Sequence, residues 1–208
     1  MKAILLSIKP KWIAKILNGD KTIEIRKTIP KCDLPIDVYI YCTKDNRKLL
    51  YSKILDNYAL EVKHDDVQNS LTDYELNGKV VAKFTVRKVE EITATEDRYG
   101  EETWYETYSL ACDELLEKSC LDFNELDEYM YGENGNAQGY AYHIEDLVIF
   151  EKPKELSEFT PICKEREKNG CGYCNICGWN KNDCLKFPNC QKRLTKAPQN
   201  FCYVESEE

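Results

Sequence analysis

The hydrophobic and polar positions of the chain predict a mixed α+β fold. Apolar residues recur at helical spacing or alternate with period two, and turn residues separate the segments. Helices are expected over 10–18, 112–118 and 124–130. Strands are expected over 3–8, 22–28, 36–42, 79–89, 139–150 and 201–205. Strands of this length with few helices favour a small mixed β-barrel with helices on its rim.

Residues 43–77 are harder to assign from the pattern alone. Leu49, Leu50, Ile54 and Leu55 have helical character, while turn residues interrupt the rest of the segment. Trp12 falls on the apolar face of the first expected helix, which predicts a position in the core.

The junction of the first helix and the second strand holds the most specific pattern, Gly-x-Lys-x-x-Glu-x-Arg over 19–26. Gly19 stands where a helix ends in a left-handed residue. A strand that buries its two isoleucines would hold Glu24 and Arg26 side by side on the other face, with Lys21 at the turn beside them. An acid flanked by two bases suits a pocket for a polar or anionic ligand. The alternative is an ordinary ion pair on a solvated strand.

Charge is unevenly distributed along the chain. The net charge of −8 argues against a protein that coats nucleic acid. Residues 2–31, however, carry eight basic and two acidic side chains, whereas residues 90–130 carry two basic and fourteen acidic ones. A basic N-terminal face next to the 19–26 pattern suits a ligand that bears phosphate.

Cysteines cluster late in the chain, with seven of the eleven after residue 160. Closely spaced cysteines suit a structural zinc ion, which takes four thiolate ligands, and the segment has too few large apolar residues for a core of its own. Free thiols, disulfides and an iron–sulfur cluster are the alternatives. The favoured zinc ligands are Cys171, Cys174, Cys184 and Cys190, with Cys163 and Cys177 in reserve.

Four segments together resemble the ASCH domain, a member of the PUA-like superfamily. They are 3–27 with its Gly-x-Lys-x-x-Glu-x-Arg signature, the strand at 78–86, the segment 139–156 and the ending 197–205. The later segments are similar to ASCH proteins of Gram-positive bacteria and their phages. The resemblance implies an α+β, PUA-like barrel domain over 1–162 plus 193–208. The cysteine spacing then predicts a zinc knuckle inserted at 163–192.

The resemblance also implies a protein that binds RNA or a modified nucleoside in a basic cleft beside the signature. Lys21 and Arg26 would meet phosphate or carbonyl oxygens, and Glu24 would accept from an amino edge. Tyr142, beside His143 on an expected strand, is a candidate for stacking on a base. The full set of expected binding residues is Ser7, Lys9, Lys11, Lys21, Glu24, Arg26, Tyr142 and His143.

A hydrolase acting on RNA or on acetylated cytidine is the alternative function. Lys21 and Glu24 would then act as acid and base on a water molecule. Amidohydrolases of the family carry a threonine at the position of Glu24, so an acyl-enzyme route is not expected here. Whether the protein is an enzyme, and its oligomeric state, stay open.

The chain contains no apolar run near the roughly 18 residues of a membrane-spanning helix. Its apolar start is too short for a signal peptide and has no small-residue cleavage site. A cytoplasmic protein without a membrane partner is therefore expected.

Overall fold

The fold is built mainly from strands, with three α-helices in the part of the chain that the computed structural model describes. That part comprises residues 2–52, 57–62, 74–96, 103–131, 138–162, 194 and 196–205. Its helices are α1 (Pro10–Leu17), α2 (Cys112–Ser119) and α3 (Phe123–Tyr131), with a short 3-10 helix η1 (Leu156–Glu158). Its strands are β1 (Lys2–Ile8), β2 (Ile23–Arg26), β3 (Ile36–Cys42), β4 (Arg47–Ser52), β5 (Asn57–Val62), β6 (Tyr74–Glu75), β7 (Val80–Val86), β8 (Val89–Glu96), β9 (Thr103–Glu106), β10 (Gly139–His143), β11 (Glu145–Lys154) and β12 (Phe201–Glu205).

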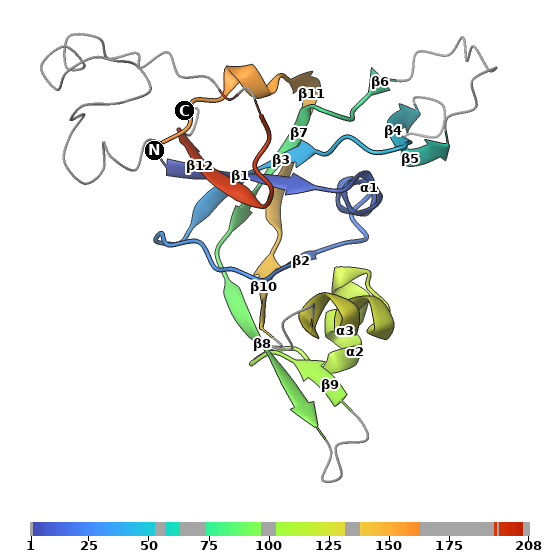
Figure 1. Cartoon of the computed structure of the whole chain (residues 1–208), viewed down its shortest axis with the longest axis vertical. Helices are drawn as coiled ribbons and strands as arrows, with labels where there is room; N and C mark the ends of the chain where they lie inside the picture. Colours follow the sequence, from blue (N-terminus) through green and yellow to red (C-terminus); the bar gives the residue numbers. More distant parts are fainter. Residues whose placement is uncertain are drawn as a thin grey trace, which may run out of the picture.

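The described strands form three sheets (Figure 1). A five-stranded sheet has the order β11-β7-β3-β1-β12, in which only β1 and β3 are parallel. A four-stranded antiparallel sheet has the order β2-β10-β8-β9, and a small sheet has the order β5-β4-β6. The five-stranded sheet curls as a half-barrel, so the expected α+β class is confirmed and the sheet is more open than the expected barrel.

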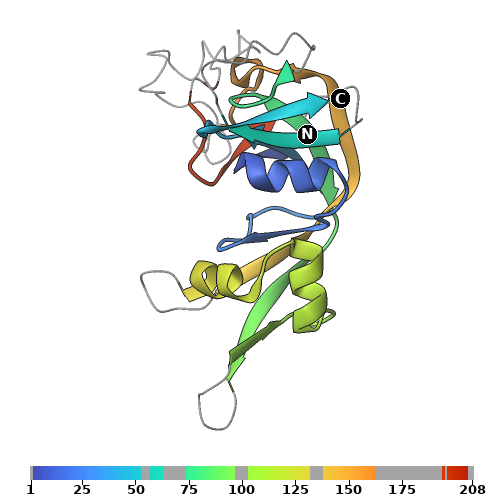
Figure 2. The ribbon, with the colours of Figure 1, turned by 90° about the vertical axis from the view of Figure 1, so that its right-hand side faces the viewer.

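The two larger sheets share the chain at two crossing points. Arg87 and Lys88 alone separate β7 from β8, and Ile144 alone separates β10 from β11. Each expected single strand, 79–89 and 139–150, is therefore two strands that belong to different sheets. Figure 2 shows α1 on one side of β2 and the helices α2 and α3 on the other.

Three groups of buried side chains hold these layers together. The largest packs α1 against one face of the five-stranded sheet, through residues such as Ile13, Leu6 and Phe84. A second group lies between the four-stranded sheet and α2 and α3, and a third covers the far face of the five-stranded sheet. The strand β1 contributes to the first and third groups, which explains why it reads as a continuous apolar run rather than an alternating one.

Two local expectations from the sequence are wrong. Leu49 and Leu50 lie in β4 rather than in a helix, because Leu49 pairs with Leu60 of β5 and is fully buried. The expected end of the strand at residue 150 is also wrong, since β11 continues through Pro153 to Lys154. β11 lies at the edge of its sheet, where a residue without an N–H group is tolerated.

Candidate functional site

The candidate site begins at the turn that connects α1 to β2. Gly19 has a left-handed φ of 83°, a conformation that glycine adopts without a steric penalty. The N–H groups of Asp20 and Lys21 both donate to the carbonyl of Lys15, at 2.9 and 3.0 Å. This reversal directs β2 back past α1, and it confirms the predicted helix-ending role of Gly19.

The start of β2 is held by the C-terminal end of α2. The N–H of Thr22 donates to the carbonyl of Lys118 at 2.9 Å. Lys21 Nζ donates to the carbonyl of Ser119 at 2.7 Å, across 98 residues of sequence. The last carbonyls of a helix have no partner within it and carry a partial negative charge, so they suit a lysine ammonium group.

Lys21, Glu24 and Arg26 form a row of charged side chains along β2. Lys21 Nζ lies 3.4 Å from Glu24 Oε2, and Arg26 Nη2 lies 2.9 Å from Glu24 Oε1. Lys21 is 3 % exposed and Glu24 is 5 % exposed, while Ile23 and Ile25 turn to the opposite face and are buried. The predicted alternation of β2 is therefore confirmed, and the ion pairs are buried rather than solvated.

The environment of this row changes the chemistry of its lysine. Burial lowers the pKa of Lys21 from its ordinary value of 10.5, because removal from water disfavours the charged amine, and the Glu24 carboxylate acts in the opposite sense.

Arg26 ties the row to β1 and to the loop just before β12. Its Nη2 also donates to the carbonyl of Ser7 at 2.8 Å, and its Nη1 donates to Asn200 Oδ1 at 3.3 Å. Its Nε is buried and has no hydrogen-bond partner within the described residues. Buried donors are nearly always paired, so this N–H needs an explanation.

The row faces a cleft of about 920 Å³. The walls come from the start of α1, from β2, from the α2–α3 turn with α3, and from the loop before β12. Its lining residues are Ser7, Ile8, Lys9, Trp12, Lys21, Glu24, Ile25, Arg26, Lys27, Thr43, Leu121, Glu125, Glu128, Tyr129, Ala197, Pro198 and Gln199.

Two aromatic side chains bring flat surfaces to this cleft. Trp12, on α1, has Lys11 Nζ at 4.2 Å and Lys21 Nζ at 5.3 Å from its ring centroid. Tyr129, on α3, has Lys27 Nζ at 5.5 Å from its ring centroid. Trp12 was expected in the core, but it is only half-buried and forms part of the cleft wall.

Five of the eight binding residues predicted from the sequence line the cleft, namely Ser7, Lys9, Lys21, Glu24 and Arg26. Lys11 is not one of the lining residues, but it forms an ion pair with Glu125, which is.

Tyr142 and His143 do not line the cleft. Tyr142 is 1 % exposed within the largest apolar group, and its hydroxyl donates to the carbonyl of Thr28 at 2.5 Å. His143 points to the other face of β10, where its Nε2 lies 2.7 Å from Glu90 Oε2. The structure thus places neither ring where it could stack on a ligand in the cleft.

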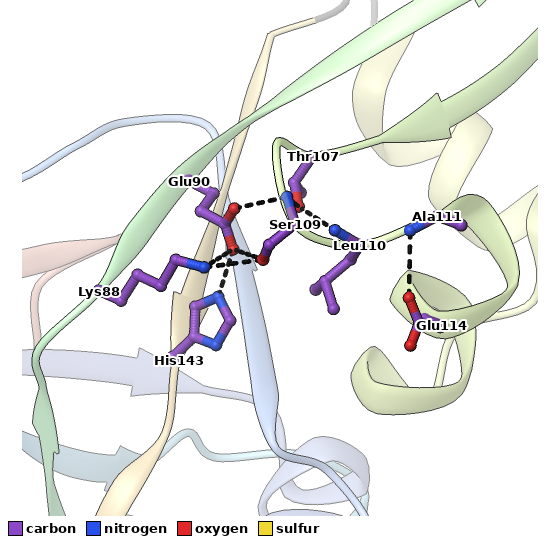
Figure 3. Close-up of polar contacts among 8 residues, drawn as sticks. All are labelled: Lys88, Glu90, Thr107, Ser109, Leu110, Ala111, Glu114 and His143. Carbon is purple, nitrogen blue, oxygen red and sulfur yellow. Dashed lines mark hydrogen bonds and ion pairs between the residues drawn. The ribbon is translucent and has the colours of Figure 1, made fainter.

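A second polar cluster, centred on Glu90, was missed from the sequence (Figure 3). Glu90 Oε1 accepts from the N–H of Ser109 at 2.9 Å, and Oε2 accepts from Ser109 Oγ at 2.8 Å. Lys88 Nζ and His143 Nε2 lie 3.0 and 2.7 Å from Oε2. Burial alone would raise the pKa of Glu90, but hydrogen bonds from Lys88, Ser109 and His143 outweigh it and lower the pKa to about 2.

The Glu90 cluster joins two strands of the four-stranded sheet to the loop that leads into α2. Glu90 lies on β8, His143 on β10, and Ser109 in the loop that leads into α2. Since every strong contact of Glu90 is already made, the cluster serves to fix the α2–α3 unit on the four-stranded sheet. No local sequence pattern predicts the Glu90 cluster, because its members are far apart in the chain.

The expected zinc ligands Cys171, Cys174, Cys184 and Cys190 lie outside the described residues, as does the insert at 163–192. Among the residues that are described, no group of three or more His, Cys, Asp or Glu side chains is placed to hold a metal ion. Five cysteines of the described part, Cys32, Cys42, Cys112, Cys120 and Cys202, are free thiols.

The described part of the chain contains no helix long and apolar enough to cross a membrane.

Comparison with known families places these features in context. The model of the ASCH domain matches residues 6–126, which is more than half of the chain and includes α1, β2 and most of the cleft. The chain therefore belongs to the ASCH domain family, a family associated with the binding of RNA and other nucleic acids.

Solved structures of an ASCH protein from Zymomonas mobilis are similar to the chain at low identity. One shares 14 % identity with a TM-score of 0.43, covering 92 % of this chain and 96 % of that one. A mutant form of the same protein shares 13 % identity with a TM-score of 0.41, covering 98 % and 88 %. A second mutant form shares 14 % identity with a TM-score of 0.37, covering 91 % and 99 %. No curated protein matches the chain.

Proposed function

We propose that the protein binds single-stranded RNA or a modified nucleoside in the cleft beside β2. The observation that carries this proposal is the buried row of Lys21, Glu24 and Arg26 on the cleft wall. Burying three charged side chains side by side is costly, and an apolar strand would be cheaper if the row served stability alone. A ligand with both donors and acceptors along one edge could hydrogen-bond to this row, which would explain why the charged side chains are there.

The side chains around the row support the same ligand class. Lys9 and Lys27 add positive charge at exposed positions of the cleft, where phosphate oxygens would remain partly solvated. Trp12 and Tyr129 offer ring faces on which a base could stack. The unpaired Nε of Arg26 is a donor that a carbonyl or phosphate oxygen could satisfy.

Titration of a fluorescently labelled short RNA at several salt concentrations tests the proposal. Lys9→Gln and Lys27→Gln should each lower the affinity and reduce the logarithmic salt slope by about 0.7 per lost phosphate contact. Lys15→Gln removes the same charge from α1 outside the cleft and should leave both quantities nearly unchanged. Trp12→Leu should weaken binding by about 1–3 kcal/mol if a base stacks on the ring.

Absence of RNA binding even at low salt would reject the nucleic-acid proposal. Equal effects of the three lysine substitutions would show that binding is diffuse and that the cleft is not its site.

A hydrolase remains the second candidate, because one observation favours it. Lys21 is buried with a lowered pKa and lies 3.4 Å from Glu24, which suits an acid and base pair. Incubation of the protein with acetylated cytidine, followed by chromatography for free acetate and cytidine, tests this. Turnover that Lys21→Met abolishes would favour catalysis over simple binding.

A further inference from the structure

We propose that Glu125 is a specificity-determining residue that holds Lys11 until a phosphate-bearing ligand displaces it. The inference rests on the proposed function and concerns the same cleft. Lys11 Nζ donates to Glu125 Oε1 at 2.5 Å. Lys11 belongs to α1 and Glu125 to α3, and these helices lie on opposite sides of β2 (Figures 1 and 2). The ion pair therefore links α1 to the α3 wall of the cleft.

The carboxylate of Glu125 is held in place by the start of its own helix. Its Oε2 accepts from the N–H of Asp122 at 3.2 Å, and the N–H of Glu125 donates to Asp122 Oδ1 at 2.8 Å. This reciprocal arrangement is a capping box. Because one oxygen is used in the cap, the other is presented to Lys11 at little additional cost in side-chain entropy.

The lysine is also constrained, but by a contact that a ligand could share. Lys11 Nζ lies 4.2 Å from the centroid of the Trp12 ring. A base stacked on Trp12 would bring its own phosphate close to this ammonium group. The position of Lys11 is thus suited to a phosphate that arrives together with a base.

The pair is weak enough to exchange. The side chain of Lys11 is 40 % exposed and that of Glu125 is 35 % exposed, so water screens their attraction. A phosphate group offers more charge and more acceptor oxygens than one carboxylate oxygen. A ligand without phosphate has nothing to offer Lys11 and leaves the pair intact.

The wall that carries Glu125 is acidic. Among the side chains that α3 and the turn before it bring to the cleft, Glu125 and Glu128 are acidic and none is basic. The negative charge of that wall disfavours contact with phosphate, so phosphate binding is favoured on the α1 side, where Lys9 and Lys11 lie. Displacement of Glu125 releases Lys11 to the ligand and moves one carboxylate away from the incoming negative charge.

A double-mutant cycle on binding of a labelled short single-stranded RNA tests the inference. Glu125→Gln keeps an oxygen for the capping box but cannot form the ion pair. It should tighten binding about two- to fivefold, the range expected for an exposed pair. Lys11→Gln should weaken binding, and adding Glu125→Gln to it should then change nothing, because the residue that Glu125 restrains is already gone.

Glu128→Gln is the matched control, since Glu128 also lines the cleft from α3. Its effect on binding should be smaller than that of Glu125→Gln and the same with or without Lys11. A gain from Glu125→Gln that persists in the Lys11→Gln background, or that merely equals the Glu128→Gln gain, overturns the inference while leaving RNA binding in place. Failure of every form to bind RNA, the parent chain included, rejects the proposed function and the inference with it.

Discussion

Glu24 stands between two cations in a site from which water is largely excluded. Lys21 and Arg26 flank it at 3.4 and 2.9 Å. The main contribution of this carboxylate to stability is that it neutralises the two positive charges, which water could not solvate in its absence.

Glu24→Gln should therefore lower the free energy of unfolding by about 3 kcal/mol or more, since it leaves two buried cations next to each other. Urea denaturation measures the change. Glu128→Gln, at an exposed position of the same cleft, should stay within about 0.5 kcal/mol of the parent. A Glu24→Gln midpoint equal to that of the parent would mean that the row is solvated after all.

Glu90 predicts how stability depends on pH. Its pKa is lowered from 4.5 to about 2 in the folded protein. The ionised form is therefore favoured by folding, and this contribution is complete above pH 4.5 and lost as the pH falls towards 2. Thermal unfolding of the parent and of Glu90→Gln should differ most near neutral pH and converge across that window. A constant difference at all pH values would show that the carboxylate charge contributes nothing.

At the scale of elements, the sequence predicted those that local periodicity defines. The helices at 10–18, 112–118 and 124–130 and the strands at 36–42 and 201–205 lie within a residue or two of α1, α2, α3, β3 and β12. Local periodicity could not show where a strand changes sheets, because the residues at the two crossing points are as apolar or as charged as their neighbours. Long-range pairing with β5 also overruled the helical character of Leu49.

The candidate site likewise contains residues that local sequence patterns predict and residues that they do not. Glu24 and Arg26 lie on one short strand and Lys21 lies just before it, so their arrangement could be predicted from local spacing. Glu125 and Tyr129 reach the cleft only because the α2–α3 unit packs beside β2, and no feature near them in the sequence indicates this. Tyr142 shows the opposite error, because it was predicted as a binding residue and is buried in the core.

The contact between β10 and α3 yields a prediction about the position of the cleft wall. A Cβ atom at Gly139 would lie 2.4 Å from Sδ and 2.9 Å from Cε of Met130, which is fully buried. Because Met130 is enclosed in the core, Gly139→Ala should force this side chain to repack under α3 and cost about 1–3 kcal/mol of stability. Because α3 carries Tyr129, ligand affinity should fall as well.

Chemical denaturation and RNA titration of Gly139→Ala check both effects. The cost in stability should be smaller when the alanine is introduced into Met130→Ala, which removes the atoms in conflict. An equal cost in both backgrounds would place the cause in the strand backbone instead.

At the scale of the whole molecule, the ends of the cysteine-rich segment are held close together. The N–H of Ile162 donates to the carbonyl of Tyr203 at 2.9 Å, and the N–H of Leu194 donates to the carbonyl of Phe159 at 3.1 Å. The two described ends of the segment therefore lie close to β12. The spacing of the cysteines between them predicts a metal-stabilised unit.

We expect one zinc ion per chain, bound by cysteines between 163 and 190. Elemental analysis of protein purified without added metal measures it. Cys171→Ser should release the metal, whereas Cys32→Ser, in the described part of the fold, should not. A zinc content near zero with all eleven thiols reactive in the folded protein would contradict the prediction.

The late position of β12 in the chain determines when the cleft is completed during translation. Ser7 Oγ donates to the carbonyl of Pro198 at 2.7 Å across 191 residues, and Arg26 meets Asn200 across 174. A nascent chain on the ribosome therefore displays β1 and the signature for most of its synthesis without the segment that completes the cleft. Until β12 emerges, β1 has one open edge, which invites pairing with another chain. Under the proposed function, ligand binding therefore requires a chain synthesised past that point, and a product that stops earlier keeps the open edge of β1.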